Sequence, residues 1–355
     1  MTSTTRLPRQ PHNNAQLKEN EMKRLQAMLT YCRPHGGAGE KQFVERFIRP
    51  YEPEEIKDAK GEVLGYIVRV GEVKDAPVLW CAHVDTVHKQ DAPVKQTIVY
   101  DEGCGMIYKD DKIMPLGADD GAGVWMLLEM IDAKVPGTYL FHRGEERGGI
   151  GSGAIADQYK TFLSPFKWAI AFDRRGTGDV ITEQFTGETA SVAFAQAFAD
   201  ALAMEYKPCP HGVFTDTANY ASIIPECTNI SVGYDNEHTP NETLDVWHLV
   251  QLRDAVITAF GKGIVLPVVR DPAASLGKWS SRLTDFEATR YEMGGWPVSA
   301  DDICSMKFKD VVRYVRDAHP EDVADLLQML AEEVNYKQYE DAAVDDAPLT
   351  NWKYY

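Results

Sequence analysis

Short apolar runs that alternate with segments of helical periodicity constrain the fold of this chain more than any other feature. Each run is nearly continuous over about five residues, as in strands that are buried on both faces of a parallel sheet. Such an alternation predicts an α/β fold, with a mainly parallel mixed sheet and helices on both faces. These runs predict strands at residues 78–82, 138–141, 168–172 and 229–232. Residues 63–70, which alternate and are rich in β-forming residues, are a further predicted strand. The predicted helices are residues 15–32, 41–48, 121–131, 188–206 and 244–260.

The two ends of the chain differ from this central region. Residues 1–14 are polar and rich in proline and asparagine, so we expect a disordered tail. Beyond residue 269 the sequence is first mixed, then shows helical periodicity, and it finally becomes acidic. We therefore divide the chain into a tail at 1–14, an α/β domain at 15–269 and a helical, acidic C-terminal appendage at 270–355.

Charge and cysteine content exclude several classes of protein. The chain carries 37 Lys and Arg against 54 Asp and Glu, a net charge of −17, which argues against a nucleic-acid partner. No apolar stretch approaches the roughly 18 residues that cross a bilayer, so no membrane partner is expected. The N-terminal segment lacks the apolar core of a secretory signal, and the six cysteines are scattered. We therefore expect free thiols and a cytoplasmic location.

Side chains that can bind a metal ion follow each of the predicted parallel strands. In α/β sheets, binding sites form at the edge where the strands end. The sequence therefore brings four sets of potential ligands to one edge of one sheet. They are His83 after residues 78–82, Glu145 and Glu146 after residues 138–141, Asp173 after residues 168–172, and His238 after residues 229–232.

Two pairs of residues in this region have both a metal-binding and an ordinary interpretation. His83 can bind a divalent metal through one ring nitrogen while Asp85 accepts the hydrogen of the other. Taken alone, the motif favours the ordinary interpretation, a strand-end histidine beside a solvated aspartate. Asp119 and Asp120 open a predicted helix, where one aspartate suffices as a cap. The pair exceeds what capping requires, and a carboxylate can bridge two metal ions through its two oxygens.

The adjacent glutamates Glu145 and Glu146 lie on a glycine-rich loop after a buried strand. Neighbouring carboxylates repel each other, so the pair calls for a reason. One reason is a division of labour, in which one glutamate binds metal and the other transfers a proton. The alternative is two solvated loop glutamates.

Taken together, the order His-x-Asp, Asp-Asp, Glu-Glu, Asp, His resembles the co-catalytic, two-zinc metallopeptidase superfamily. This superfamily includes the single-domain zinc aminopeptidases, peptidase T, and the carboxypeptidase G and aminoacylase type. The resemblance covers roughly residues 15–262 and is sharpest at AHVDTV, LGADDGAG, GEERGGIGSGA and NEHTPNETLD. It implies the zinc-exopeptidase, phosphorylase/hydrolase-like fold and makes residues 15–269 a two-metal peptidase catalytic domain.

The resemblance also implies a set of ligands. His83, Asp119 and Asp173 would hold one metal ion. Asp119, Glu146 and His238 would hold the other, so that Asp119 bridges the two. In the family the peptide bond after the bridging aspartate is commonly cis.

Two further residues take catalytic roles in the resemblance. Asp85 would support His83, and Glu145 would serve as general base and general acid. Two zinc ions, three carboxylates and a bridging hydroxide make a neutral core, which favours deprotonation of the bound water. Zinc is the expected metal, and cobalt or manganese would fit the same ligands.

The resemblance predicts a metal-dependent hydrolase that cleaves an amide bond with a two-metal-bound hydroxide. Its substrate is expected to be a peptide or an amino acid derivative, and most simply the chain is an aminopeptidase, an exopeptidase acting on short peptides. An N-acyl amino acid deacylase or a carboxypeptidase on the same site is an alternative, as is a catalytically silent binding module of this fold. The oligomeric state is left open.

Some positions separate this chain from parts of the superfamily. Gly121 stands where many relatives have a basic residue. The interval between His83 and Asp119 is shorter than a domain of at least about 50 residues, so we expect no inserted lid domain there. Asp216 is a candidate to meet a substrate's α-amine, or else forms an Asx turn. Tyr234 is a candidate to line the pocket.

Overall fold

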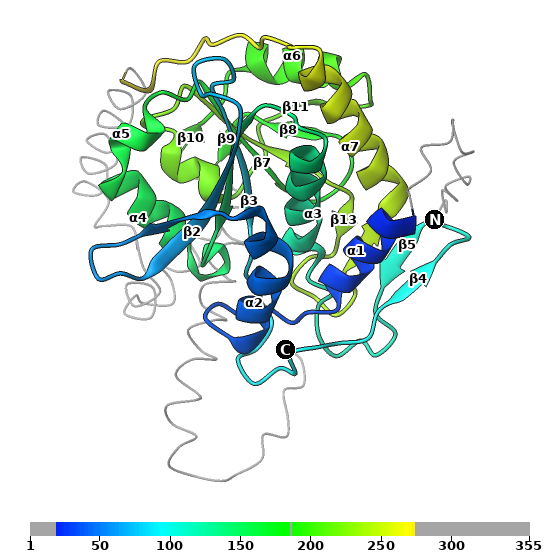
Figure 1. Ribbon diagram of the computed structural model, residues 1–355. Helices are drawn as coiled ribbons and strands as arrows, with labels where there is room; N and C mark the ends of the chain where they lie inside the picture. The colour runs from blue at the N-terminus through cyan, green and yellow to red at the C-terminus, as the bar shows by residue number, and fades with distance from the viewer. Residues whose placement is uncertain (1–18, 185–186, 274–355) are drawn as a thin grey trace, which may run out of the picture. The chain divides into compact units, whose positions relative to one another are not determined.

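The centre of the structure is an eight-stranded mixed sheet (Figure 1). The computed structural model describes residues 19–184 and 187–273. In spatial order the strands are β1 (Glu54–Lys57), β2 (Val63–Val70), β6 (Gly137–His142), β3 (Val78–His83), β7 (Trp168–Arg174), β12 (Glu226–Ser231), β8 (Asp179–Ile181) and β11 (Lys207–Cys209).

Four neighbouring strands, β6, β3, β7 and β12, run parallel and form the middle of this sheet. They contain the four apolar runs that the sequence predicted as buried strands. On one side of these four strands, β2 is antiparallel to β6, and β1 is antiparallel to β2. On the other side, β8 is antiparallel to β12. The predicted mainly parallel mixed sheet is therefore confirmed.

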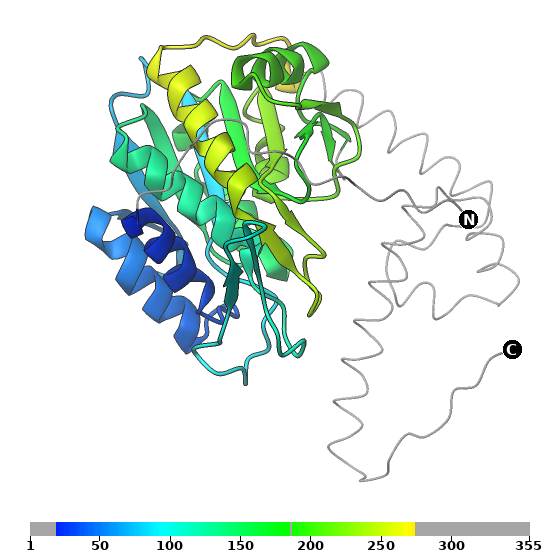
Figure 2. The same cartoon turned by 90° about the vertical axis from the view of Figure 1, so that its right-hand side faces the viewer.

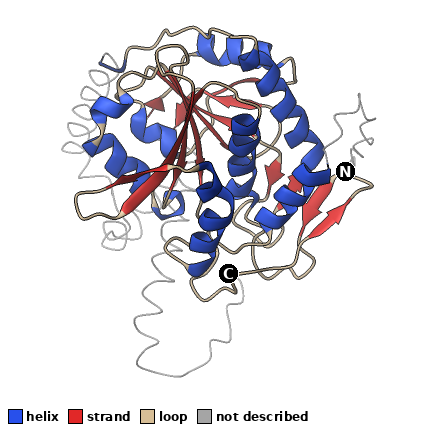
Figure 3. Ribbon diagram, in the orientation of Figure 1, coloured by secondary structure: helices blue, strands red, loops and turns tan. Residues whose placement is uncertain are grey.

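Helices cover both faces of the sheet (Figures 1 and 3). Alternate side chains of one strand enter different cores: Trp80 packs on one side and Leu79 on the other. Figure 2 shows the first of these helical layers facing the viewer. That layer contains α1 (Glu19–Leu29), α3 (Ala118–Asp132), α6 (Val192–Leu202) and α7 (Val246–Gly261). The opposite layer contains α4 (Ile150–Gln158), α5 (Lys160–Leu163) and the short helix η4 (Asp216–Tyr220).

The helix ends follow local chemistry. Helix α6 begins after Ser191, whose side chain accepts the N–H of Phe194. It ends where Ala203 adopts a left-handed conformation, with φ of 50°, so it is shorter than the predicted 188–206. Helix α7 begins after Asp245, which caps the N–H of His248 in the same way.

The predicted helix at 41–48 is formed by two consecutive helical segments, the end of α2 (Ala38–Phe43) and all of η1 (Val44–Ile48). Helix α2 leads into the wider turn η1 and the short η2 (Arg49–Tyr51). The predicted helix at 15–32 ends three residues earlier, because Tyr31 leaves the helix to bridge Lys95. Both predictions of helix are confirmed, with changed boundaries.

A small antiparallel sheet joins two loops that flank the candidate site. Its strands are too short to show a hydrophobic period, which is why the sequence did not predict them. Leu244 pairs with Ile107 and so ties the segment after His238 to the interval before Asp119. In spatial order, the strands of this small sheet are β13 (Tyr234–Asp235), β14 (Thr243–Asp245), β5 (Met106–Tyr108) and β4 (Val99–Asp101). A separate two-stranded antiparallel sheet pairs β9 (Glu183–Gln184) with β10 (Gly187–Glu188).

Several expectations concern residues that the structure does not describe. The tail at 1–14 and nearly all of the appendage at 270–355 lie outside the described residues. Within the described ranges, no helix combines the length and apolar character needed to cross a membrane. The five cysteines in these ranges are free thiols, and only Cys104 among them is exposed.

Candidate metal centre

The candidate ligands meet because β3, β6 and β7 are parallel neighbours that end at the same edge. His83 is the last residue of β3, and Asp173 lies near the end of β7. Glu145 and Glu146 stand on η3 (Glu145–Arg147), directly after β6. The carboxyl ends of parallel strands are the usual place for a site in an α/β sheet.

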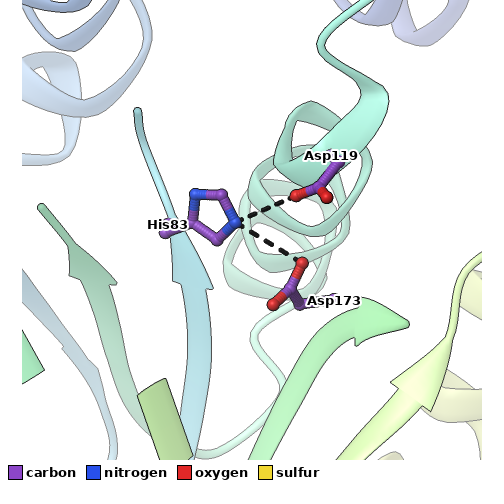
Figure 4. A group of neighbouring side chains, drawn as sticks. All are labelled: His83, Asp119 and Asp173. Carbon is purple, nitrogen blue, oxygen red and sulfur yellow. Dashed lines mark hydrogen bonds and ion pairs between the residues drawn. The ribbon is translucent and has the colours of Figure 1, made fainter. Parts of the chain in front are cut away.

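A first group consists of His83, Asp119 and Asp173 (Figure 4). Nε2 of His83 lies 3.0 Å from Oδ1 of Asp119 and 3.4 Å from Oδ1 of Asp173. The three ligand atoms lie within 4.8 Å of one another, which is close enough to surround one ion. The His83 side chain is almost fully buried.

A second group shares Asp119 with the first. Nε2 of His238 lies 3.2 Å from Oδ2 of Asp119 and 3.0 Å from Oε2 of Glu146. These ligand atoms also lie within 4.8 Å of one another. Each carboxylate oxygen of Asp119 thus faces a different group, as a bridging ligand requires. His238 comes from the loop between β13 and β14, and 41% of its side chain is exposed.

The doubled aspartate divides the two roles that the sequence left open. Asp119 faces the other candidate ligands, whereas Asp120 is fully buried and turned inward. Asp120 Oδ2 accepts the backbone N–H of His83 at 3.1 Å, and its Oδ1 accepts that of Gly123 at 2.8 Å. Asp120 therefore joins the first turn of α3 to the end of β3. The Asp119–Asp120 peptide bond is cis, as the resemblance implies.

Asp85 contacts both His83 and the glutamate loop. Nδ1 of His83 lies 3.2 Å from the backbone oxygen of Asp85 and 3.7 Å from its Oδ1. The same carboxylate accepts the N–H groups of Gly144 at 2.8 Å, Glu145 at 3.2 Å and Glu146 at 3.2 Å. Asp85 thus fixes the backbone that presents the two glutamates, a role that the sequence did not indicate.

Asp173 is held by two hydroxyl groups. Thr215 Oγ1 donates to its Oδ2 at 2.7 Å, and the Tyr234 hydroxyl donates to its Oδ1 at 3.1 Å. The Tyr234 side chain is buried, and its hydroxyl contacts the Asp173 carboxylate. These donors orient Asp173 toward His83.

Asp216 lies behind the site and is almost fully buried. Its Oδ2 is 3.1 Å from Nδ1 of His142, and its Oδ1 has no hydrogen-bond partner. Nε2 of His142 in turn lies 2.7 Å from the Tyr220 hydroxyl. Burial raises the pKa of Asp216 to about 8.

Burial and mutual contact shift the pKa values of the candidate ligands. Burial raises the pKa of Glu146 to about 7, and it raises the pKa of Glu145 well above its usual range. Burial would lower the pKa of His238, but hydrogen bonds with Asp119 and Glu146 outweigh it and raise that pKa to about 12. Burial would raise the pKa of Asp119, and its hydrogen bonds with His238 and His83 instead hold it below its usual range. The buried carboxylates of the cluster therefore favour a positively charged group between them.

The donor set fits divalent metal ions. Oε1 of Glu146 is buried and has no hydrogen-bond partner, although it stands beside Asp119 and His238. An unpartnered buried carboxylate oxygen is costly in a protein unless a cation or donor reaches it. Imidazole and carboxylate are the ligands of catalytic zinc and related metals.

Two residues that the sequence analysis did not identify hold the turn at residues 117–119, which carries the aspartate shared by both groups. Glu242 accepts the N–H groups of Gly117 at 2.8 Å and Asp119 at 2.9 Å. Arg33 is fully buried and donates to the backbone oxygens of Val84 at 2.9 Å and Gly117 at 3.0 Å. Glu242 ends the NEHTPNE stretch that follows the last parallel strand, which was its only sequence signal. Arg33 had none.

The family match and the fold confirm the resemblance to the co-catalytic metallopeptidase superfamily. The sequence profile of peptidase family M28 matches residues 66–246, about half of the chain. The chain therefore belongs to peptidase family M28 and is a metallopeptidase. A search of curated protein sequences found no match.

Solved structures share the fold at low sequence identity. Aminopeptidase PepT from Bacillus cereus superposes with a TM-score of 0.55 at 14% identity, covering 69% of this chain and 98% of that one. A tripeptidase from Staphylococcus aureus gives 0.52 at 15% identity, covering 68% and 97%. The TET aminopeptidase of a marine-sediment Thaumarchaeota archaeon gives 0.50 at 12% identity, covering 69% and 99%.

Proposed function

We propose that this chain is an aminopeptidase that hydrolyses short peptides with two metal ions, by default zinc. The observation that carries this proposal is the placement of Asp119 between two groups of ligand atoms, one oxygen toward His83 and the other toward His238. A single metal ion would need only one such group. The second group also has the unpartnered oxygen of Glu146 beside it.

The proposed ligands divide between a closed side and an open side. His83, Asp119 and Asp173 would hold one ion in the buried side. Asp119, Glu146 and His238 would hold the other, on the side where the histidine is partly exposed. When bound, such ions lower the pKa of a water molecule and polarise the substrate carbonyl. Because the His238 side is open, we propose that the substrate approaches from there.

Glu145 is the proposed proton carrier. Burial raises its pKa well above the usual range of a glutamate, as a group that accepts a proton and later donates it requires. Its Oε2 lies 3.9 Å from Nε2 of His83, so it stands at the cluster without being within bonding distance of that ligand. We propose that it takes the proton of the attacking water and delivers it to the leaving amine.

The proposed preference for a free amino terminus draws support from solved structures that share this fold. Those structures are described as aminopeptidases and a tripeptidase. Asp216 remains a proposed amine-binding residue, although its carboxylate is turned toward His142.

Turnover of a matched substrate panel by the purified full-length chain tests this function. The panel contains short peptides with a free amine, the same peptides N-acetylated, and N-acyl amino acids, each with added zinc, cobalt or manganese. We expect hydrolysis of the free-amine peptides only. Hydrolysis of the blocked compounds alone would show a deacylase, and equal hydrolysis of the free and the N-acetylated peptides would show a carboxypeptidase. No hydrolysis of any compound would contradict a peptidase.

Two variants separate chemistry from folding. Glu145→Gln is expected to retain both metal equivalents and to lose turnover by about 10²–10⁴-fold, the usual contribution of a general acid–base residue. Glu183→Gln, an exposed glutamate on β9, is the matched control and should be fully active. Equal activity of the two variants would rule out Glu145 as the proton carrier.

A further inference from the structure

Glu242 is a buried carboxylate whose two oxygens both accept backbone N–H groups of one turn. Its Oε2 accepts from Gly117 at 2.8 Å and its Oε1 from Asp119 at 2.9 Å. Only 1% of the residue is exposed. The buried guanidinium of Arg33, which donates to the oxygen of Gly117, supplies a nearby opposite charge. The turn that precedes α3 is thus held from both sides by charged groups.

Glu242 also belongs to the loop that carries His238. The two residues are four positions apart, between β13 and β14. Glu242 therefore forms a direct link between the backbone of Asp119 and the loop of the histidine that faces the same carboxylate. This link spans 123 residues of sequence, from Asp119 to Glu242.

We infer that Glu242 is a positioning residue that sets the distance between Asp119 and His238 and so completes the second metal position. This inference rests on the proposed two-metal function. Glu242 touches neither a ligand atom nor a place for an ion, because its oxygens are engaged by backbone N–H groups. Outer hydrogen bonds of this kind orient metal ligands and affect metal affinity by about 10- to 100-fold.

The first metal position has supports of its own. The backbone of His83 is held by Asp120, and the carboxylate of Asp173 is held by Thr215 and Tyr234. None of these contacts involves Glu242. Loss of the Glu242 carboxylate should therefore weaken the second position more than the first.

The test compares Glu242→Gln with Glu226→Gln, a control of the same chemistry. Glutamine keeps the shape of glutamate, but its NH₂ group would face a backbone N–H that needs an acceptor. Glu226 is equally buried and accepts the N–H groups of Ser191 at 2.6 Å, Val269 at 2.7 Å and Arg270 at 3.0 Å. It is the first residue of β12, at the edge of the sheet opposite the candidate site.

The measurement is a cobalt titration of the metal-free full-length chain, followed by calorimetry and by the visible spectrum of the bound ion. We expect two equivalents in the wild type and in Glu226→Gln with equal affinities. In Glu242→Gln the second equivalent should weaken by about 10- to 100-fold and the first much less. Two equivalents bound with wild-type affinities by Glu242→Gln would overturn the role of Glu242.

The outcomes separate this inference from the proposed function. A wild type that binds fewer than two equivalents would overturn the two-metal site itself. Thermal unfolding of the metal-free forms should show similar losses for Glu242→Gln and Glu226→Gln, so that a difference in metal binding is specific. If Glu242→Gln does not fold, Glu242→Asp replaces it, because aspartate keeps the charge but is one methylene too short to reach both N–H groups. Wild-type binding of the second equivalent by that variant would also overturn the inference.

Discussion

The carboxylate of Asp120 accepts the backbone N–H of His83 at 3.1 Å and so joins the start of a helix to the end of a strand. Its other oxygen accepts the N–H of Gly123 at 2.8 Å. The neighbouring Asp119 points the opposite way, toward the candidate ligands. The two adjacent aspartates therefore have different roles: Asp120 fixes the backbone on both sides of the site, and Asp119 faces the other candidate ligands.

Replacement of Asp120 tests that division. Asp120→Asn leaves one of two buried N–H groups opposite an amide NH₂, which should lower the free energy of unfolding by about 1–3 kcal/mol. It should also weaken metal binding, because the end of β3 carries His83. Chemical denaturation and metal titration measure the two effects.

Asp132→Asn is the matched control for this variant. Asp132 ends the same helix, is exposed, and accepts from Arg24 at 2.8 Å and from Tyr51 at 2.9 Å. An exposed pair of this kind contributes about 0–1 kcal/mol, and metal binding should be unchanged. Equal metal affinities for the Asp120 and Asp132 variants would show that Asp120 has no part in forming the site.

The hydroxyl of Thr215 offers a second test. Thr215→Val keeps the side-chain volume and removes the hydrogen bond to Oδ2 of Asp173, which should weaken binding at the His83 side. Thr217→Val is the control, because Thr217 is also buried in this segment but donates to the backbone oxygen of Thr228 at 3.2 Å. Both variants should lose about 0.5–1.5 kcal/mol of stability, and only the first should bind metal less tightly. A metal titration that gives identical curves would contradict this.

Metal affinity should rise with pH. Without metal, hydrogen bonds with Asp119 and Glu146 outweigh burial and raise the pKa of His238 to about 12, so at neutral pH its ring carries a proton that metal must displace. Burial raises the pKa of Glu146 to about 7, so this carboxyl too is partly protonated below that pH. Both shifts have the same sign: more protons are bound at lower pH, and each competes with metal.

Calorimetry in buffers of different ionisation enthalpy measures this release directly. Between about pH 6 and pH 8 we expect protons to leave the protein on zinc or cobalt binding, and the apparent affinity to increase steadily. The observed heat should therefore depend on the buffer. A heat independent of the buffer, with an affinity independent of pH, is incompatible with protonated ligands in the metal-free state.

Gly123 is a position where even one carbon atom does not fit. A Cβ there would lie 2.3 Å from Oδ1 of Asp120 and 2.3 Å from the backbone oxygen of Phe172. Gly123→Ala should therefore cost about 1–3 kcal/mol of stability and push α3 away from β7. Gly153 in α4 has nothing nearer than 3.9 Å, so Gly153→Ala should gain up to about 1 kcal/mol from helix propensity. Unfolding curves that move in the same direction for both variants would contradict this packing argument.

Local signals explain what the sequence could predict. The four parallel strands are runs of apolar residues that lie next to each other in the sheet, and each is followed by a candidate ligand. Because parallel strands end at one edge, the proximity of His83 and Asp173 followed from the order of motifs alone. The roles of the individual ligands came from the resemblance.

Contacts between distant segments explain what the sequence could not predict. Arg33 reaches Gly117 across 84 residues, and Glu242 reaches Gly117 across 125. Neither contact leaves a pattern in the sequence. Every residue except proline carries the same backbone N–H and C=O groups, so the type of the residue that is contacted gives no signal. Strands of two or three residues, such as β13 and β5, are also too short to show a period.

The small sheet formed by β13, β14, β5 and β4 has a consequence for the order in which the protein opens. It is built from strands of two or three residues, whereas the buried half of the site rests on the longer parallel strands of the main sheet. Ladders with few hydrogen bonds open at lower free energy than longer ones, so amide hydrogens of Tyr234–Asp235 and Thr243–Asp245 should exchange with solvent before those of β3 and β7. His238 would then leave the cluster while His83 and Asp173 are still in place, and the metal centre would come apart one half at a time.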